Sequence, residues 1–151
     1  MDKALFGAGC FWGVEECFRK INGVISTQVG YSGGDTQNPT YHDVCGSKTG
    51  HAEVLKIEFD SYIISYKKLL DYFWECHDPT TLNMQGPDIG SQYRSVIFYF
   101  SEEQKKIAEE SKIRNQMKFK NKIVTEIRKI DTFYLAEDYH QRFLQKRENT
   151  V

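Results

Sequence analysis

The stretch Ala4-Leu5-Phe6-Gly7-Ala8-Gly9-Cys10-Phe11-Trp12-Gly13-Val14 joins a strand signal directly to a helix signal. Its first half is a short apolar run that ends at a glycine, which is typical of a buried strand. Beyond it, apolar residues recur with the spacing of one helix face, at Val14, Cys17, Phe18 and Ile21. The sequence therefore predicts a strand over 3–8 followed directly by a helix over 11–21, with Cys10 at the junction.

Strand and helix signals alternate along the rest of the chain. The periodicity of apolar residues predicts strands over 24–31, 51–59, 92–100 and 123–130, and helices over 66–74, 101–118 and 136–145. Residues 31–50 and 79–90 are expected to be long loops, and loops of that length inside a domain usually carry function.

The order β-α-β-β-α-β predicts an α+β fold. We expect a ferredoxin-like split βαβ two-layer sandwich with an appended α-β-α and long active-site loops. A length of 151 residues suits a single catalytic domain over 1–151.

Composition and charge exclude several classes of protein. Twenty basic and 21 acidic residues give a net charge of −1, so no excess of positive charge favours binding to nucleic acid. The apolar runs fall far short of the roughly 20 residues of a membrane span, and no cationic region precedes the first one. Four cysteines are too few for a disulfide scaffold, so we expect a reducing, cytoplasmic compartment. We also expect a monomer, because no long apolar stripe requires a partner.

Cys10 is the first candidate for chemistry. A thiol at a helix N-terminus faces free N–H groups and the positive end of the helix dipole, which favour the nucleophilic thiolate. Gly9 and Gly13 leave room for close approach, and Phe11 and Trp12 are expected at the exposed start of the helix. The alternative, a small buried hydrophobe, is the commoner fate of a free cysteine, and spacing alone leaves both open.

The other cysteines have less distinctive positions. Cys17 and Cys76 fall on the predicted core faces of their helices, and Cys17 lies about 10 Å along the helix axis from Cys10, too far for a disulfide. Cys45 lies in a long loop and is free to move. Because no Cys-x-x-Cys pair occurs, we expect no metal site.

Glu53 shares a strand face with Leu55, Ile57 and Phe59. A carboxyl group on an apolar face is costly unless it is paired or protonated, and burial raises its pKa towards that of a general acid. The alternative is a solvated carboxylate beyond the rim of the core. Three more polar candidates flank the long loops, namely Tyr41, Asp88 and Tyr93.

Two other functions fit the same residues. A hydrolase or acyl transferase would pair Cys10 with a histidine base, for which His51 is the candidate by position. A binding module would use Phe11 and Trp12 as an aromatic cage. A hydrolase would consume no reductant, and a binding module would tolerate Cys10→Ser.

The chain resembles the peptide methionine sulfoxide reductase A family. The resemblance rests on motifs in the family's order along nearly the whole chain: Gly9-Cys10-Phe11-Trp12-Gly13-Val14-Glu15, Gly30-Tyr31-Ser32-Gly33-Gly34, Asn38-Pro39-Thr40-Tyr41, Gly50-His51-Ala52-Glu53, His77-Asp78-Pro79-Thr80, Gln92-Tyr93-Arg94-Ser95 and Ala136-Glu137-Asp138-Tyr139-His140-Gln141.

The resemblance implies thiol-dependent reduction of methionine S-sulfoxide, free or in proteins, without a bound cofactor. Cys10 would attack the sulfoxide sulfur and become a sulfenic acid, and Glu53 would protonate the oxygen. The remaining roles would fall to Tyr41, Tyr93 and Asp88 on the polar side of the pocket and to Phe11 and Trp12 around the substrate methyl group.

The sequence departs from the family in its cysteines. Many relatives recycle through cysteines in a C-terminal tail, whereas here no cysteine follows Cys76, so we expect that relay to be absent. The sulfenic acid would be reduced directly by an external thiol, from thioredoxin or from glutaredoxin with glutathione. The alternative is a disulfide between Cys10 and Cys45 as the resolving cysteine. Pro87 and Leu135 also stand where the family often has other residues, and we expect them to alter loop geometry alone.

Overall fold

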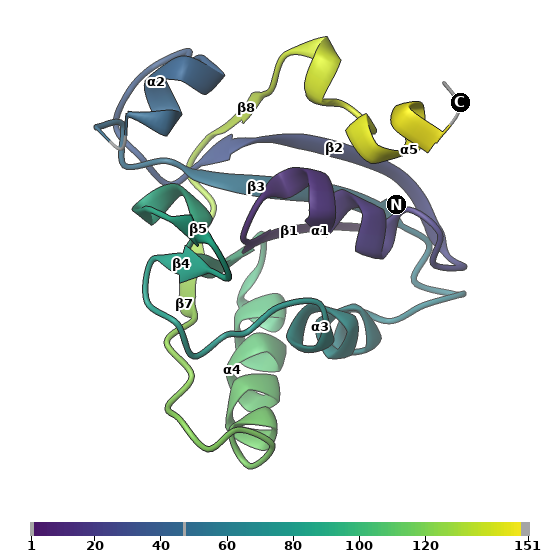
Figure 1. The fold of residues 1–151 in the computed structure, drawn as a ribbon. Helices are drawn as coiled ribbons and strands as arrows, with labels where there is room; N and C mark the ends of the chain where they lie inside the picture. The colour runs from purple at the N-terminus through teal and green to yellow at the C-terminus, as the bar shows by residue number, and fades with distance from the viewer. Residues whose placement is uncertain (1, 47, 149–151) are drawn as a thin grey trace.

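The computed structural model describes residues 2–46 and 48–148. It is a mixed α+β structure in which one large sheet carries helices on one face (Figure 1). The elements are β1 (Asp2–Ala8), α1 (Phe11–Phe18), β2 (Val24–Ser32), α2 (Tyr41–Cys45), β3 (Ala52–Phe59), α3 (Tyr66–Glu75), β4 (Met84–Gln85), β5 (Asp88–Ile89), η1 (Ser91–Tyr93), β6 (Ser95–Tyr99), α4 (Glu102–Gln116), β7 (Glu126–Lys129), β8 (Phe133–Leu135), η2 (Asp138–His140) and α5 (Phe143–Glu148).

The large sheet has the strand order β7-β6-β1-β3-β2-β8. Neighbouring strands are antiparallel except for the parallel pair β6 and β7. The two central strands β1 and β3 pair from Asp2 opposite Phe59 to Phe6 opposite Leu55. The register of β2 on β3 places Tyr31 opposite Glu53, so the candidate acid lies near the start of β3, an inner strand of the sheet.

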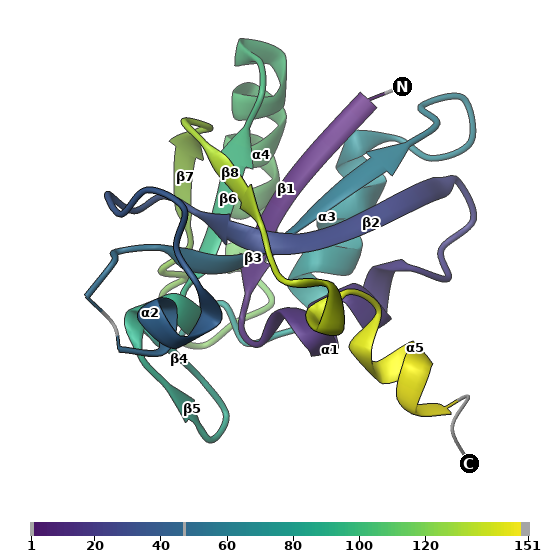
Figure 2. The same cartoon turned by 90° about the horizontal axis from the view of Figure 1, so that it is seen from above.

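The sheet is strongly curled. β7 and β8 lie at opposite edges, five strand spacings apart, which in a flat sheet is about 24 Å. Only residues 130–132 connect them, and a chain that short spans at most about 14 Å. Seen from above, this connection passes over the sheet from β7 to β8 (Figure 2). The edges must therefore curve towards one another, and the Arg128 guanidinium of β7 reaches the carbonyl oxygen of Gly33, just beyond β2, at 3.3 Å.

Alternating side chains supply two cores on the two faces of the sheet. The larger core joins the strands to α1, α3 and α4, and its largest buried side chains include Phe6, Phe18, Phe59 and Phe73. The smaller core holds Leu5, Ala52, Val54, Val96 and Phe98, and Ile130 of the β7–β8 connection and Phe133 of β8 pack against it.

Most of the long predicted elements are present. The strands predicted over 3–8, 24–31 and 51–59 correspond to β1, β2 and β3, and the helices predicted over 66–74 and 101–118 correspond to α3 and α4. Ser101 caps α4 by accepting a hydrogen bond from the backbone N–H of Gln104. The helix predicted over 11–21 is shorter and ends at Phe18.

The two expected long loops contain short elements that apolar periodicity does not detect. The first contains α2, which begins with a capping box between Thr40 and Asp43. The second contains the β4–β5 hairpin and leads into η1, so the strand predicted over 92–100 begins only at Ser95.

The prediction for the C-terminal region was wrong in detail. The single helix expected over 136–145 is divided into η2 and α5, because the backbone of Arg142 has a φ of 51° and breaks the helical run. β8 lies where no strand was predicted. The strand predicted over 123–130 is the shorter β7.

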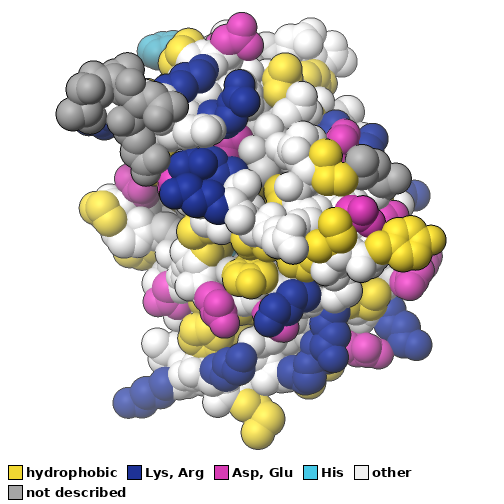
Figure 3. Space-filling model, turned by 90° about the vertical axis from the view of Figure 1, so that its right-hand side faces the viewer, with side chains coloured by type: hydrophobic (Ala, Val, Ile, Leu, Met, Phe, Trp, Pro, Cys, Tyr) yellow, Lys and Arg dark blue, Asp and Glu magenta, His cyan; other side chains and the backbone are white. Residues whose placement is uncertain are grey.

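The surface is mixed in character. On the face drawn in Figure 3, basic and acidic side chains are interspersed, with hydrophobic groups between them. Among the helices of the described ranges, none has the length and apolar character needed to cross a membrane.

Candidate active site

Cys10 lies where β1 passes into α1. It is the N-cap residue of the helix, and its carbonyl oxygen accepts hydrogen bonds from the N–H groups of Gly13 and Val14. Gly9 makes this junction possible: its φ of 102° is left-handed, and an added Cβ would lie 2.8 Å from Cγ of Gln85. The side chain of Cys10 is half-buried, so it is neither enclosed in the core nor freely solvated.

The resting ionisation of Cys10 differs from the sequence prediction. Burial is the largest influence and raises the pKa of the thiol to about 11. The backbone N–H groups of Trp12 and Gly13 act in the predicted direction, but the negative charges of Glu53 and Asp88 oppose them. The prediction of a lowered pKa was therefore wrong, because the helix terminus is only one of several influences. Cys10 rests as a thiol.

Glu53 is a buried carboxyl group beside Cys10. Its side chain is 1 % exposed, and Oε1 accepts a hydrogen bond of 3.3 Å from the backbone N–H of Phe11, the residue after Cys10. Within the described part of the chain, Oε2 is buried with no hydrogen-bond partner. Burial, with a smaller effect from Asp88, raises the pKa of Glu53 to about 8. At neutral pH the group is therefore a carboxylic acid that holds a proton.

The three polar candidates lie around this pair. Tyr41 opens α2, Asp88 opens β5 and Tyr93 ends η1. The charges of Glu53 and Asp88 raise the pKa of Tyr93, after burial, to about 12. Burial, a hydrogen bond donated to Cys45 and the charge of Glu53 raise the pKa of Tyr41. Both phenols therefore remain protonated and are hydrogen-bond donors.

Aromatic rings form the other wall. Trp12 is partly exposed and stacks on Phe143 with ring centroids 4.0 Å apart, and Tyr41 stacks on Phe11 at 6.2 Å. Phe11 is fully buried, so the prediction that it lies at the exposed start of the helix was wrong. The ring of Phe11 packs against Tyr31. Of Phe11 and Trp12, Trp12 is therefore the one that a substrate can reach.

Two residues that position the site were not singled out from the sequence. His140 is buried and accepts a 2.9 Å hydrogen bond at Nδ1 from the indole N–H of Trp12. Glu137 accepts one hydrogen bond from the hydroxyl of Tyr31 and another from the backbone N–H of Tyr41. Both belong to the Ala136–Gln141 motif, which was the available signal, but their distance of about a hundred residues from their partners hides the contacts.

His51 does not support a cysteine–histidine hydrolase. Its Nδ1 accepts a hydrogen bond from the N–H of Gly34, and its Nε2 bonds to the carbonyl oxygen of Thr36. Both ring nitrogens are thus used to fix a loop. Over the described ranges, the side chains form no group of three or more candidate metal ligands.

Cys17 is exposed, in contrast to the predicted core position. Glu15 is buried in its place, because its carboxylate accepts hydrogen bonds from the hydroxyl of Thr27 at 2.7 Å and from the backbone N–H of Arg142. Cys76 packs against the core but is only half-buried. Cys45 is exposed at the end of α2.

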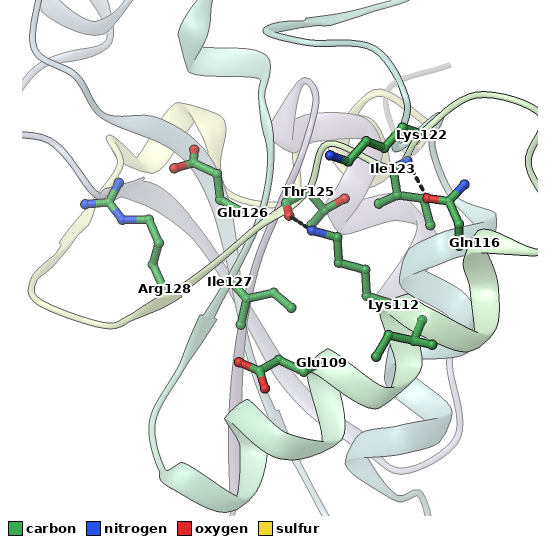
Figure 4. A pocket seen from close by; sticks show the side chains of 10 residues that line it. Glu109, Lys112, Gln116, Lys122, Ile123, Thr125, Glu126, Ile127 and Arg128 are labelled. Atoms are coloured by element: carbon green, nitrogen blue, oxygen red, sulfur yellow. Dashed lines mark hydrogen bonds between the residues drawn. The ribbon is translucent and has the colours of Figure 1, made fainter.

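A large cavity of about 810 Å³ lies elsewhere, between α4 and β7. Its lining includes Ile113, Ile123 and Ile127, and the ammonium group of Lys112 donates a hydrogen bond to the carbonyl oxygen of Thr125 (Figure 4). Its lining includes neither Cys10 nor Glu53.

A thiol at a helix N-terminus, a protonated buried acid and two phenols therefore lie together where β1 passes into α1. The family model described as peptide methionine sulfoxide reductase matches residues 2–151, and the chain belongs to that family. It is a methionine sulfoxide reductase.

Similar proteins share most of the chain. A peptide methionine sulfoxide reductase MsrA of Methanothermobacter thermautotrophicus is 59% identical over 147 residues, which cover 96% of this chain and 87% of that protein. The reduced form of Mxr1 from Saccharomyces cerevisiae is 39% identical, with a TM-score of 0.94 and coverage of 99% and 87%. Mxr1 in complex with Trx2 matches at 28% identity, with a TM-score of 0.68 and coverage of 94% and 84%.

Proposed function

We propose that Cys10 is the nucleophile and Glu53 the proton donor with which this reductase acts on methionine S-sulfoxide, free or in proteins. One observation carries the proposal: a buried, protonated carboxyl group with an unpartnered oxygen lies beside a half-buried thiol. An unpartnered buried oxygen is costly unless a ligand completes its bonding. The sulfoxide oxygen, a strong acceptor, would accept the proton held at that position.

The steps balance in atoms and electrons. Glu53 donates its proton to the sulfoxide oxygen while the sulfur of Cys10 attacks the sulfoxide sulfur as its own proton leaves. The sulfur–oxygen bond of the substrate breaks, and the oxygen passes to Cys10 as a hydroxyl group. Methionine is released, reduced by two electrons, and Cys10 becomes a sulfenic acid. The proton from the thiol returns Glu53 to its acid form.

The surrounding groups bind the two ends of the substrate head. Tyr41 and Tyr93 would donate hydrogen bonds to the developing charge on oxygen, in the manner of an oxyanion hole. Asp88 helps to keep Glu53 protonated. Trp12, backed by Phe11, would contact the methyl group, and a pocket with one polar and one aromatic side favours one epimer, as expected where each epimer has its own enzyme.

Recycling requires an external thiol, and no bound cofactor is needed. The likeness to Mxr1, which was solved in complex with Trx2, supports thioredoxin, and glutaredoxin with glutathione would supply the same electrons. Direct reduction of the sulfenic acid is the simplest route. A disulfide between Cys10 and Cys45 is the alternative, because Cys45 is exposed beside Tyr41 and influences the pKa of Tyr93.

We further assign residues 1–151 to a single catalytic domain that acts as a cytoplasmic monomer. The four strands β6, β1, β3 and β2, adjacent and antiparallel in that order, support the ferredoxin-like split βαβ assignment. The curl of the sheet and the β7–β8 connection are additions to that unit.

Single-turnover kinetics test the central assignment. Glu53→Gln keeps the shape of the side chain but cannot donate the proton, so we expect the chemical step to slow by about 10²-fold or more. Glu58→Gln on the same strand is the matched control and should react at the wild-type rate. A Glu53→Gln variant that matches wild type would remove Glu53 from the mechanism, and a Cys10→Ser variant should form no methionine.

A further inference from the structure

A groove of about 380 Å³ adjoins Cys10 on the side of α1 that faces the end of α3. Its lining contains three of the four cysteines of the chain: Ala8, Gly9, Cys10, Gly13, Val14, Cys17, Cys76, His77, Gln85 and Gly86. Gly13 leaves the space beside the first turn of α1 open, because nothing lies within 4 Å of where a Cβ would be. The catalytic thiol and two further thiols thus share one solvent-connected space.

Cys17 and Cys76 form a pair of unlike thiols. Cys17 is exposed on α1, whereas Cys76 is half-buried as the C-cap residue of α3. The nearby Cys76 side chain lowers the pKa of Cys17 to about 7, and Cys17, together with burial, raises the pKa of Cys76. The sulfur of Cys76 also lies 3.8 Å from Nδ1 of His77. An accessible thiolate next to a protected thiol is the arrangement of a redox-active dithiol.

We propose that Cys17 and Cys76 form a second redox centre, which takes the oxidising equivalents from the sulfenic acid of Cys10 and presents them to the external thiol. The proposal rests on the assignment of Cys10 as the nucleophile. It adds an internal disulfide between the sulfenic acid and the reductant, by a route that does not use Cys45.

The geometry decides which thiol attacks first. Cys10 and Cys17 are held on one helix about 10 Å apart along its axis, whereas sulfur atoms in a disulfide are about 2.05 Å apart. Cys76 belongs to a different element, so its approach to Cys10 does not require α1 to unwind. Gln85 and Gly86, on the far side of the groove, belong to the β4–β5 hairpin rather than to a long helix. Cys76 is therefore the thiol that attacks the sulfenic acid of Cys10 first.

The chemistry balances in two steps. The sulfur of Cys76 attacks the sulfur of Cys10, and the thiol proton of Cys76 leaves with the hydroxyl group as water, which gives a Cys10–Cys76 disulfide. The thiolate of Cys17 then attacks the sulfur of Cys76, which releases Cys10 as a thiolate. The net result is one water, a reduced Cys10 and a Cys17–Cys76 disulfide, whose exposed Cys17 sulfur an external dithiol can attack.

Counting methionine in the absence of any reductant tests the proposal. Reduced enzyme is mixed with excess methionine sulfoxide, the methionine formed in the burst is measured per chain, and the oxidised chain is mapped by peptide mass spectrometry. A relay frees Cys10 for a second attack, so we expect two methionines per chain together with a Cys17–Cys76 cross-link. Direct reduction and the Cys10–Cys45 route both stop at one.

Three single variants complete the test. Cys17→Ser and Cys76→Ser should each give one methionine, and that first methionine shows that the variant is folded and active. Cys45→Ser, which removes the other candidate thiol, is the matched control and should retain the two-methionine burst. If Cys76→Ser gives none, Cys76→Ala replaces it as the better match for a half-buried site.

The outcomes separate the two proposals. One methionine from wild type, or two from Cys17→Ser or Cys76→Ser, overturns the relay and leaves Cys10 as the nucleophile. A Cys45→Ser variant that gives one methionine also overturns it. If wild type forms no methionine, or Cys10→Ser still forms it, the assignment of Cys10 fails and the relay fails with it.

Discussion

At the scale of single residues, two pKa values determine which groups of the candidate site hold protons. Glu53 has a pKa of about 8 and Cys10 one of about 11, so both hold their protons at pH 7. In the proposed mechanism this state supplies both protons, because the proton of Glu53 goes to the sulfoxide oxygen and the proton of Cys10 restores the acid. A carboxylate at Glu53 would remove the donor and would also oppose ionisation of Cys10.

The first prediction is therefore kinetic. The single-turnover rate constant with saturating sulfoxide should be level below pH 8 and should fall about tenfold per pH unit above it, as Glu53 loses its proton. A stopped-flow series from pH 6 to pH 10 gives the profile. The Glu53→Gln variant should lack the fall above pH 8, and a rate that rises steadily with pH in wild type would contradict the assignment.

The second prediction concerns stability. The pKa of Glu53 is raised in the folded state from 4.5 to about 8, so the folded protein holds a proton that the unfolded chain has lost between these values. The contribution of Glu53 to the free energy of unfolding is fully present below pH 4.5, where both states hold the proton. It is lost as the pH rises towards 8, because the unfolded chain ionises first.

Thermal unfolding checks this linkage. The melting temperature of Glu53→Gln relative to wild type should increase from pH 5 to pH 8 and should then remain constant. Glu58→Gln serves as the control and should show no such trend. A difference for Glu53→Gln that is independent of pH would mean that burial does not hold the proton on this side chain.

At the scale of elements, α1 depends on two glycines of opposite character. Gly9 needs its left-handed φ of 102° to turn the chain from β1 into the helix. Gly13 lies within the first turn with open space around it, so there the lack of a side chain weakens the helix. The third prediction uses this contrast.

We expect Gly9→Ala to destabilise the protein and Gly13→Ala to stabilise it. The first forces strain and a 2.8 Å contact with Gln85, whereas the second replaces glycine by alanine in a helix, which is worth about 1 kcal/mol. For a chain of this size that corresponds to a rise of about 2–4 °C in melting temperature. The two changes in stability need not be equal in size. A Gly9→Ala variant that is more stable than wild type would contradict the backbone geometry at Cys10.

The sequence predicted the elements whose apolar pattern is long. Period-two alternation placed Glu53 on the buried face of β3, and the glycine-flanked junction placed Cys10 at a helix start. Short elements such as α2 and the β4–β5 hairpin have too few residues for a period. Cys17 was misassigned because Glu15 is buried by hydrogen bonds from residues distant in the chain, and no local pattern reports them.

At the scale of the whole molecule, the C-terminal segment holds the aromatic side of the site against the sheet. β8 pairs with β2 only from Gly30 to Ser32, and beyond that point the side chain of Gln141 takes the place of a strand. Its amide accepts from the N–H of Val29 and donates to the carbonyl oxygens of Val29 and Ala136, all at 2.9 to 3.0 Å. His140, the neighbour of Gln141, fixes the indole of Trp12.

The fourth prediction follows from this arrangement. Gln141→Ala leaves the backbone N–H of the buried Val29 without its partner, at a cost of about 1–3 kcal/mol, while the carbonyl oxygen of Val29 keeps the N–H of Ala136. The segment should then detach more often, and amide hydrogen exchange over residues 133–148 should quicken. Because His140 would hold Trp12 less well, KM for the sulfoxide should rise more than kcat falls. Gln145→Ala, in the same segment on α5, is the control and should change neither measurement. If Gln141→Ala quickens exchange but leaves KM unchanged, the segment supports the fold without positioning Trp12 for the substrate.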